Sequence, residues 1–528
     1  MAKNTRNIID NVKSVRTNQA EKRAKEVDAT QQRNPDIASG TVEGLYSKGL
    51  PHDETTLVGD KFEIQKIQLA VDSGSQADFD SINLAGASKL ASPQGSLSSE
   101  LSGGDPEGIT MDPPPALNSR QAAAEMAEVY LKNIMRDKPF IEYEDGSQEI
   151  TDALAILNAF GADFKGPKDG VNVTAKTLFR GSSATCLVGG YVSQLYLNTV
   201  GVGNFSYEPV GPTDAGSYGI RQDDYLAIQR GDIPVAQEKT NTGAEEGKYM
   251  FNGRQLGSTV HIDLVFQHFY EAAAVLLNAK ASVGTQIKVG PKEGNFLGGP
   301  VLTTTMIAEV SRHALRAAWV QKWRKHLRLR PEAMAGRIVA EMEGDLPAGT
   351  VHSDIFSIQD TGGNSIVDLV RAHNRVTVAN PDTGDLGDDK PWLPLQYAEG
   401  SPTHPAYPAG HATIAGACAT ILKIMFAETG TLWSTLNLGE KQATADGSDI
   451  TDYMGSDVGM TTIHGEIDKL AHNVALGRDF AGVHYRSDSE LALGEKVAIQ
   501  YYKDQKALFN EEVDLVEFVG FDGEIIRV

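Results

Sequence analysis

Cysteine is nearly absent from this sequence, basic residues are outnumbered, and no long apolar run occurs. The two cysteines, Cys186 and Cys418, cannot form a disulfide framework, so we expect two buried structural thiols. The 48 basic residues stand against 70 acidic ones, which gives a formal net charge of −22. Because phosphate backbones and anionic lipid headgroups would repel such a surface, we expect no nucleic-acid partner and no membrane partner.

No stretch of the chain reaches the roughly 18 uninterrupted apolar residues that a membrane-spanning helix needs. Residues 1–36 carry charges throughout and lack the apolar segment of a secretory signal. We therefore expect a soluble protein, placed in the cytoplasm by default.

With 41% hydrophobic residues, the chain is able to bury one large core or two medium ones. Residues 1–117 are polar at first and rich in Ser, Gly and Pro from 91 onward, which predicts an arm and a linker, with oligomer contacts as one role of the arm. Residues 118–510 are expected to form the main helical domain. In residues 511–528, Asp522 and Gly523 separate VEFVGF from EIIRV, a pattern typical of a β-hairpin.

Apolar residues recur at three- and four-residue spacing along five segments that are too long and too rich in Ala and Leu for strands. The first segment follows Asn118 and Ser119, which are both candidate N-caps. The five expected helices cover residues 120–135, 261–281, 303–326, 411–429 and 487–509. Strand signals are sparse and no internal repeat is present. The sequence thus predicts a mainly α protein, a helical bundle with minor β-hairpins.

Three segments that lie far apart in the sequence each carry groups suited to hold a tetrahedral oxyanion. The first is QKWRKHLRLRPEA, in which Lys322 and Arg330 are eight positions apart. Eight helical residues come to about 80° past two full turns, so both cations could lean to one side, with Pro331 ending the helix at Arg330. A solvated basic face is the alternative for this segment taken alone.

The second segment, HPAYPAGHATIAGA, leads through Pro408 and Gly410 into an Ala-rich helix with His411 at its start. A helix start presents free N–H groups and the positive end of the helix dipole, and a glycine there lets an anion approach the backbone. An ordinary Pro-Gly turn into a helix is the alternative.

The third segment, GRDFAGVHYRSDSE, carries Arg478, His484 and Asp488. An imidazole that binds a metal or attacks phosphorus needs one nitrogen free and the other held, commonly by a carboxylate. Asp488 is a candidate for that task, although it could cap the following helix or pair with Arg478. A purely structural histidine is the alternative.

In order, these residues run Lys, Arg-Pro, Gly-His, then Arg with a His and an Asp downstream. This order resembles the superfamily of the vanadium haloperoxidases and the type 2 phosphatidic-acid phosphatases, whose signature is Lys, Arg-Pro, Pro-Ser-Gly-His, and Ser-Arg followed by His and Asp. Seven residues separate Lys322 from Arg330, as in the algal-type bromoperoxidases, whereas the phosphatases and fungal chloroperoxidases have six. The flanking segments AWVQKW, RPEAMAG, YAEGSPTHPAYPAGHAT and GVHYRSD also resemble algal and cyanobacterial bromoperoxidases, over roughly residues 115–510.

The resemblance implies a fold of two four-helix bundles and a vanadate cofactor, whose site phosphate could also fill. It implies that hydrogen peroxide oxidises a halide, for which bromide is expected, to a hypohalous acid that halogenates small organic acceptors; the sequence does not decide between bromide and chloride. His484 would bind vanadium, and the vanadate oxygens would be surrounded by Lys322, Arg330, Arg478 and the Gly410 amide. Family members of this type assemble as dimers or larger shells, so a homo-oligomer is expected.

The resemblance also assigns residues around the reacting oxygen. His411 would accept a proton as peroxide binds, and Lys322 would polarise a bound peroxide oxygen. His404 matches a histidine that lines the halide approach. Trp319 matches a position where brown-algal members carry Trp and red-algal members carry Arg. A loop-capping imidazole and a core indole are the respective alternatives.

One position departs from the family pattern. Ala409 stands where the family has serine, so a hydroxyl hydrogen bond to a vanadate oxygen is missing, and we expect weaker retention of the cofactor with surviving activity. Two other functions stay open: an acid phosphatase on the same scaffold with His484 as nucleophile, and a non-catalytic structural or storage protein. The acidic loop at residues 381–389 is compatible with Ca²⁺ or Mg²⁺ and with a solvated loop.

Overall fold

The computed structural model describes residues 9–18, 21, 33–98, 104–202, 205–211, 216–233, 247–282, 299–380, 384–426, 429–509 and 513–528. Its helices are α2 (Pro35–Ser39), α3 (Lys61–Ser73), α4 (Gln76–Asp80), α5 (Arg120–Ile134), α6 (Gln148–Ala159), α7 (Gln222–Arg230), α8 (Gly253–Thr259), α9 (Gln267–Asn278), α10 (Pro300–Val320), α11 (Pro331–Glu343), α12 (Asp354–Ser357), α13 (Ile366–Asn374), α14 (Gly410–Met425), α15 (Ile463–Phe480) and α16 (Ala492–Leu508). The strands form two-stranded antiparallel pairs: β1 (Val200–Val202) with β2 (Phe205–Tyr207), β3 (Val378–Asn380) with β4 (Asp385–Leu386), β5 (Lys441–Ala443) with β6 (Ile450–Asp452), and β7 (Glu517–Val519) with β8 (Ile525–Arg527). The expected mainly α fold is confirmed.

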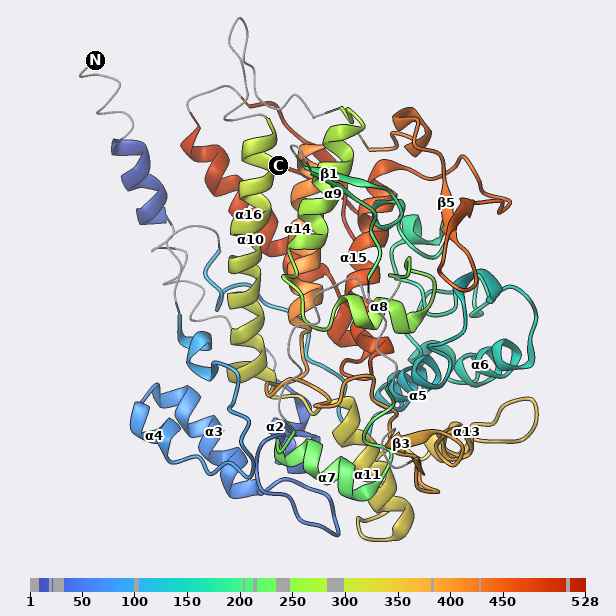
Figure 1. Cartoon of the computed structure of the whole chain (residues 1–528). Coiled ribbons are helices and arrows are strands. Elements are labelled where there is room, and N and C mark those ends of the chain that lie inside the picture. The colour runs from blue at the N-terminus through green and yellow to red at the C-terminus, as the bar shows by residue number, and fades with distance from the viewer. Residues whose placement is uncertain are drawn as a thin grey trace, which may run out of the picture.

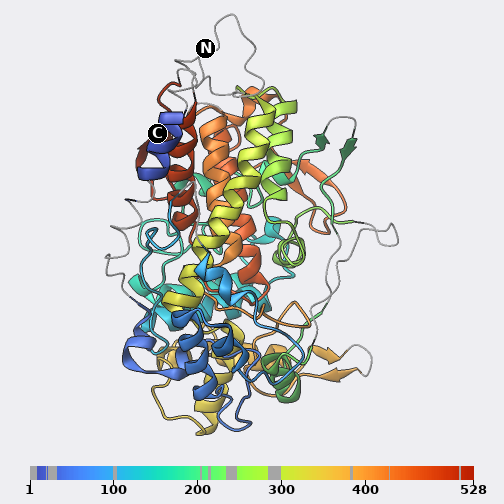
Figure 2. The same ribbon diagram turned by 90° about the vertical axis from the view of Figure 1, so that its left-hand side faces the viewer.

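The centre of the fold is helix α14, which runs among α10, α15 and α16 (Figures 1 and 2). Small residues let α14 and α16 approach closely. A Cβ at Gly416 would lie 2.2 Å from the Leu491 carbonyl oxygen, and one at Gly494 would lie 2.0 Å from the Thr413 carbonyl oxygen. Larger side chains at these two glycines would force the two helices apart, so this pairing depends on them.

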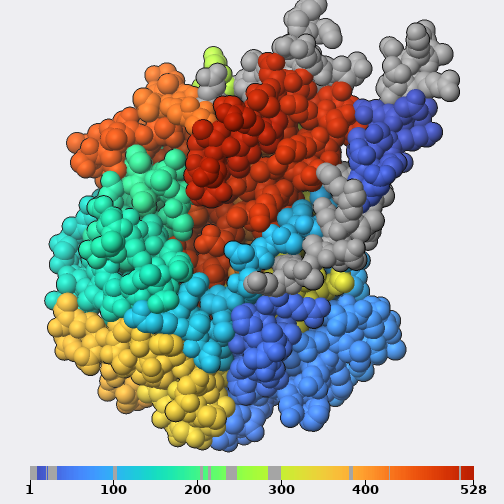
Figure 3. All heavy atoms as spheres, turned by 180° about the vertical axis from the view of Figure 1, so that it is seen from behind, coloured from blue at the N-terminus to red at the C-terminus, as the bar shows by residue number. Residues whose placement is uncertain are grey.

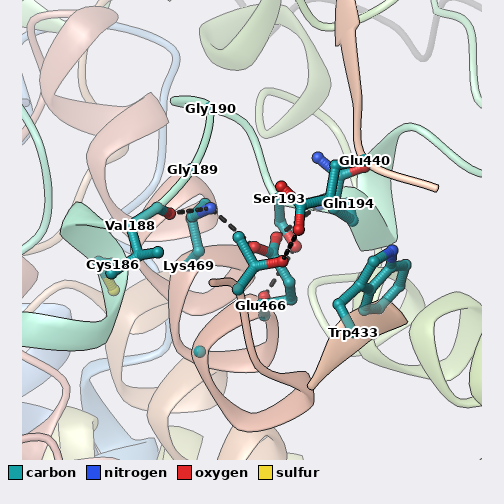
Figure 4. A network of polar contacts seen from close by, with 12 residues as sticks. Cys186, Val188, Gly189, Gly190, Ser193, Gln194, Trp433, Glu440, Glu466 and Lys469 are labelled. Atoms are coloured by element: carbon teal, nitrogen blue, oxygen red, sulfur yellow. Dashed lines mark hydrogen bonds and ion pairs between the residues drawn. The ribbon is translucent and has the colours of Figure 1, made fainter. Parts of the chain in front are cut away.

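Helix α15 is buried along its whole length although it carries several charged residues. Lys469 donates hydrogen bonds to Glu466 and to the Val188 carbonyl, both at 2.8 Å, and Glu466 accepts the Gln194 amide at 2.7 Å. Figure 4 shows this network, which joins α15 to residues 186–194, a segment from a much earlier part of the chain. Because the buried charges of Lys469 and Glu466 are partnered in this way, α15 is held firmly enough to position the residues at its carboxyl end.

Part of the segment expected as an arm is packed against the main body. Leu45, Tyr46, Leu50, Ile64, Ile67 and Val71 form a hydrophobic cluster with Trp323 and Leu327 at the end of α10. This part appears blue at the lower end of the bundle in Figure 1 and from behind in Figure 3. The division of the chain at residues 117 and 510 stays a prediction.

Several local expectations can be compared directly with the structure. The Ser119 side chain accepts the Ala122 amide and caps α5, and the hairpin at the carboxyl end is present as β7 and β8. The prediction that Pro331 ends the helix is wrong. The helix changes to π hydrogen bonding at Gln321–His326 and ends at Leu327, whose φ of 45° is left-handed, while Pro331 begins α11. Proline suits this first helical position because its missing N–H needs no partner there.

Both cysteines are free and buried, and burial raises the pKa of each thiol. Within the described ranges, no helix combines the length and the apolar character that crossing a bilayer requires.

Candidate active site

Three cations from different elements meet at the ends of α10, α11 and α15. Lys322 lies in the π-helical end of α10, Arg330 is the N-cap of α11, and Arg478 lies in the last turn of α15. All three are buried, with exposed fractions of 0%, 1% and 3%. The π-helical turn is the kind of local distortion that often marks a functional position on a helix.

These cations bond to carbonyls and imidazoles. Lys322 Nζ donates to the carbonyls of Pro405 and Ala406 at 2.6 and 2.9 Å. Arg478 Nη1 donates to the Val260 carbonyl at 2.6 Å, while its buried Nε has no partner within the described ranges. None of the three cations is paired with a carboxylate of the described residues, so positive charge is concentrated here.

Electrostatics reflect that concentration. Burial and the neighbouring Arg330 hold the pKa of Lys322 well below its usual value. Burial likewise lowers the pKa of Arg330 to about 10, with Arg478 contributing in the same direction. The pKa of nearby Arg328 is raised instead, because the carboxylates of Asp488 and Glu125, at 2.6 and 2.9 Å, outweigh the effect of burial. The three unpaired cations therefore form a site that favours a multiply charged anion.

His484 is the imidazole at the centre of this arrangement. Its Nδ1 lies 2.9 Å from Asp488 Oδ2, so Nδ1 carries the proton and Nε2 keeps its lone pair. Arg330 Nη1 donates to that Nε2 at 3.0 Å. Burial and Arg330 hold the pKa of His484 well below its usual value, so the ring stays neutral at physiological pH. A neutral imidazole with one nitrogen fixed by a carboxylate is the form in which histidine binds metals.

The Asp488 carboxylate has three hydrogen-bond partners among the described residues, and Arg478 is not one of them. Besides His484, it accepts the Tyr485 amide at 3.0 Å and an Arg328 N–H at 2.6 Å. Of the suggested alternatives, the Asp488 side chain both lies against the imidazole and caps the 3₁₀-helix at Arg486–Ser489, whereas no pairing with Arg478 occurs among the described residues. Arg328 belongs to the segment for which a solvated basic face was the alternative, yet it is 5% exposed and fixes Asp488.

His411 stands in the first turn of α14 and is partly exposed. Its Nε2 lies 2.8 Å from Asp263 Oδ1, and the other oxygen of that carboxylate lies 2.9 Å from His268 Nε2. Burial lowers the pKa of His411, whereas Asp263 raises it. The carboxylate fixes the proton on Nε2, so Nδ1 is the nitrogen of His411 able to accept a proton.

Asp263 was missed by the sequence reasoning. It lies within the segment 261–281 that was expected to be helical from its start, whereas α9 begins only at Gln267. Burial acts to raise the pKa of Asp263, but His411 and His268 outweigh it and hold that pKa far below the usual range. The pattern H-x-D ahead of a helix was the one available signal.

Gly410 is the first residue of α14, and Ala409 is its N-cap without a side-chain hydrogen bond. A Cβ at Gly410 would lie 3.6 Å from Trp319 and 3.7 Å from Leu315, so this helix start has apolar neighbours. The Ala409 amide donates to the Asp488 carbonyl at 2.7 Å, which joins the second and third motifs. The helix start thus lies beside the His484 loop, as an anion cradle requires.

His404 and Trp319 lie together beside Lys322. Their ring centroids are 4.8 Å apart, and Lys322 Nζ lies 6.0 Å from the Trp319 ring centroid. Arg330 donates to His404 Nδ1 at 3.0 Å, and burial with Lys322 and Arg330 holds the pKa of His404 well below its usual value. All ten residues singled out from the sequence belong to this one neighbourhood.

The donor set fits vanadate. The tetrahedral oxyanion needs several N–H donors and local positive charge, which the three cations, the unpartnered Nε of Arg478 and the start of α14 provide. Among the described residues, no cluster of three or more His, Cys, Asp or Glu side chains could hold a bare metal ion. The site therefore suits an oxyanion joined to a single imidazole.

Comparisons with known proteins agree with this geometry. A family model described as the second helical-bundle domain of VCPO matches residues 366–511. The chain is 29% identical over 506 residues to a vanadium-dependent bromoperoxidase of Ascophyllum nodosum, covering 92% of this chain and 86% of the relative. It is 28% identical over 572 residues to a vanadium-dependent bromoperoxidase of Corallina officinalis, covering 94% and 93%.

A solved structure extends the agreement to the whole fold. The homohexameric second vanadate-dependent bromoperoxidase from Ascophyllum nodosum superposes with a TM-score of 0.86 at 25% identity, covering 98% of this chain and 89% of that one. The match includes the amino-terminal part that the motifs left unexplained. Together with the motifs and their convergence on one buried cluster of cations, these likenesses support the resemblance of the chain to the vanadium-dependent haloperoxidases over nearly its whole length.

Proposed function

We propose that this protein is a vanadate-dependent bromide peroxidase, which uses hydrogen peroxide to oxidise bromide to hypobromous acid that halogenates small organic acceptors. One observation carries the proposal. Three buried cations, which have no carboxylate partner among the described residues, surround His484. Asp488 holds Nδ1 of this imidazole, so Nε2 keeps its lone pair and faces Arg330, from which it accepts a hydrogen bond. The named relatives, which are vanadium-dependent bromoperoxidases, support the choice of cofactor and halide.

The residues divide the work of holding the cofactor. His484 would bind vanadium through Nε2, and Lys322, Arg330, Arg478 and the Gly410 amide would hold the oxygens. Bound vanadate supplies a Lewis-acidic centre that activates peroxide toward a halide without a change in its own oxidation state. Inorganic phosphate, which has the same shape and a similar charge, is expected to compete for the same donors.

We assign the proton transfers to His411. The neighbouring aromatic groups, His404 and Trp319, would line the approach of the halide. His411 Nδ1 would accept a proton from peroxide and give it to the leaving hydroxyl, which departs as water, while Asp263 keeps the ring oriented. With vanadate bound, the Lys322 ammonium would polarise the peroxide oxygen that bromide attacks. His404 and Trp319 border the side from which bromide reaches Lys322.

A paired assay tests this function. The protein freed of vanadate is loaded with orthovanadate and mixed with bromide, peroxide and phenol red, and it is assayed in parallel for hydrolysis of p-nitrophenyl phosphate. We expect vanadate-dependent bromination that is lost in His484→Ala. Phosphate ester hydrolysis without bromination would instead support the phosphatase, and the absence of any vanadate-dependent turnover would support the non-catalytic alternative.

We also propose that the chain assembles as a homo-oligomer, which the homohexameric relative supports and which light scattering after size-exclusion chromatography would measure. A Ca²⁺ or Mg²⁺ site at residues 381–389 stays a prediction, and residues 381–383 lie outside the described ranges. Among the described residues of that loop, Asp389 faces Arg371 and Arg375, and Asp388 accepts the Gln222 amide. These partners favour the solvated-loop alternative.

A further inference from the structure

A short segment of the amino-terminal part lies against the proposed halide approach. Residues 89–95, which we name the strap, run from Lys89 into the 3₁₀-helix η2 (Pro93–Leu97). They belong to the region for which the sequence motifs offered no function. Their contacts reach Trp319 and Thr403, the residue that precedes His404.

One residue of the strap, Ala91, is bonded to both sides of the approach. The Ala91 amide donates to the Thr403 carbonyl at 2.8 Å, and Thr403 lies next to His404. The Ala91 carbonyl accepts the Trp319 indole N–H at 3.3 Å. A third hydrogen bond, from the Thr403 hydroxyl to the Lys89 carbonyl, joins the strap to the same residue. The positions of His404 and the indole are therefore coupled through Ala91.

The strap also limits where the indole can lie. A Cβ at Gly95 would lie 3.0 Å from Trp319 Cδ1, and one at Gly410 would lie 3.6 Å from Trp319 Cζ3. The ring is thus wedged between the strap on its pyrrole side and the start of α14 on its other side. Ser92, directly after Ala91, has a φ of 44°, a left-handed conformation that is uncommon for a residue with a side chain. The backbone turns sharply here, which brings both Ala91 and Gly95 against the indole.

We propose that the strap is a specificity-determining part of the active site, which sets the width of the halide approach by fixing Trp319 against His404. This inference rests on the proposed bromide peroxidase function. Ala91 and Gly95 act as positioning residues, because they touch Trp319 and not the reacting atoms. The region outside the catalytic motifs thereby contributes to the choice of halide.

The variant Gly95→Ala tests whether the strap fixes the position of the Trp319 indole. Its new methyl group would press on Trp319 Cδ1 and push the indole toward Gly410. Gln94→Ala is the matched control, because it adds no atom near the indole and lies in the same short helix. Trp319→Phe completes the set by removing the indole N–H and the five-membered ring.

Fluorescence gives a readout that does not need activity. The sequence has four tryptophans, of which Trp323, Trp392 and Trp433 are fully buried, so collisional quenching by iodide reports on Trp319. In Gly95→Ala we expect the quenching constant to change by at least about twofold, while Gln94→Ala stays at the wild-type value. Trp319→Phe should abolish most of the quenching.

Kinetics of the vanadate-loaded protein then test specificity. We expect the KM for bromide in Gly95→Ala to rise at least about threefold, with the Kd for vanadate changed by less than about twofold, because the wedge touches the approach and not the cations. In the Trp319→Phe background the effect of Gly95→Ala on KM should vanish.

The outcomes separate the two proposals. Equal quenching and equal KM in Gly95→Ala and Gln94→Ala would overturn the strap. A KM effect of Gly95→Ala that persists in Trp319→Phe would overturn it as well, because the indole would then not carry the effect. If the wild-type protein fails to oxidise bromide, the proposed function falls, and a halide-selective role of the strap falls with it, whereas the quenching data still decide whether the strap positions the indole.

Discussion

The substitution Ala409→Ser, which restores the hydroxyl group that the family has at this position, is the sharpest test of the proposed oxyanion site. Ala409 is fully buried at the N-cap of α14, with φ −66° and ψ 131°, a conformation in which a serine side chain can accept an amide of the first helical turn. The same hydroxyl can donate its proton to an oxyanion held at that helix start. The substitution therefore has two separable effects, one on cofactor binding and one on stability.

The expected magnitudes follow from these two bonds. A hydrogen bond to a charged acceptor contributes about 1.5–3 kcal/mol, which corresponds to roughly a 10- to 150-fold lower Kd for vanadate. A serine N-cap in place of alanine adds about 1 kcal/mol to the free energy of unfolding even without vanadate. Calorimetric titration with orthovanadate and urea denaturation of the vanadate-free protein measure the two quantities independently.

A control of similar size excludes a packing effect. Ala409→Cys adds an atom of comparable volume, but its S–H is a weak donor, so its Kd should stay near the wild-type value in titrations without peroxide. A Kd for Ala409→Ser within about twofold of wild type would refute the reasoning, because it would show that another donor already serves that oxygen.

Three further changes have defined outcomes. Asp263→Asn removes the group that raises the pKa of His411, so that pKa falls and the acidic limb of kcat/KM for peroxide should move to lower pH; a limb that stays in place or moves upward would contradict this role. Asp488→Asn should weaken vanadate binding about 10- to 100-fold in a titration, because the imidazole proposed to bind vanadium loses the carboxylate that orients it and Arg328 loses a charged partner, whereas unchanged affinity would show that orientation does not depend on charge. Ser119→Ala removes a cap bond and should lower the free energy of unfolding by about 1 kcal/mol in urea without altering the KM for bromide; an unchanged unfolding midpoint would show that the cap is dispensable.

Local signals in the sequence were sufficient for much of the fold. The helices that bury one apolar face, such as α5 with its serine cap, follow from spacing that any window of residues reveals. The sequence did not predict helix α15, because its charged residues resemble those of a solvated segment. Only their partners in a distant loop, such as Val188 for Lys469, show that those charges are buried.

The order Lys322, Arg330, Gly410, Arg478 and His484 indicated an oxyanion site from sequence alone, because chemistry and spacing are local properties of the chain. Tertiary structure decided what those groups do. It showed that the three cations have no carboxylate partner among the described residues, that Asp488 is shared with Arg328, and that Asp263 holds His411. It also brought Ala91 against Trp319 across more than two hundred residues of chain. Such contacts depend on how helices pack in three dimensions, and packing partners at that separation leave no periodic trace in a single sequence.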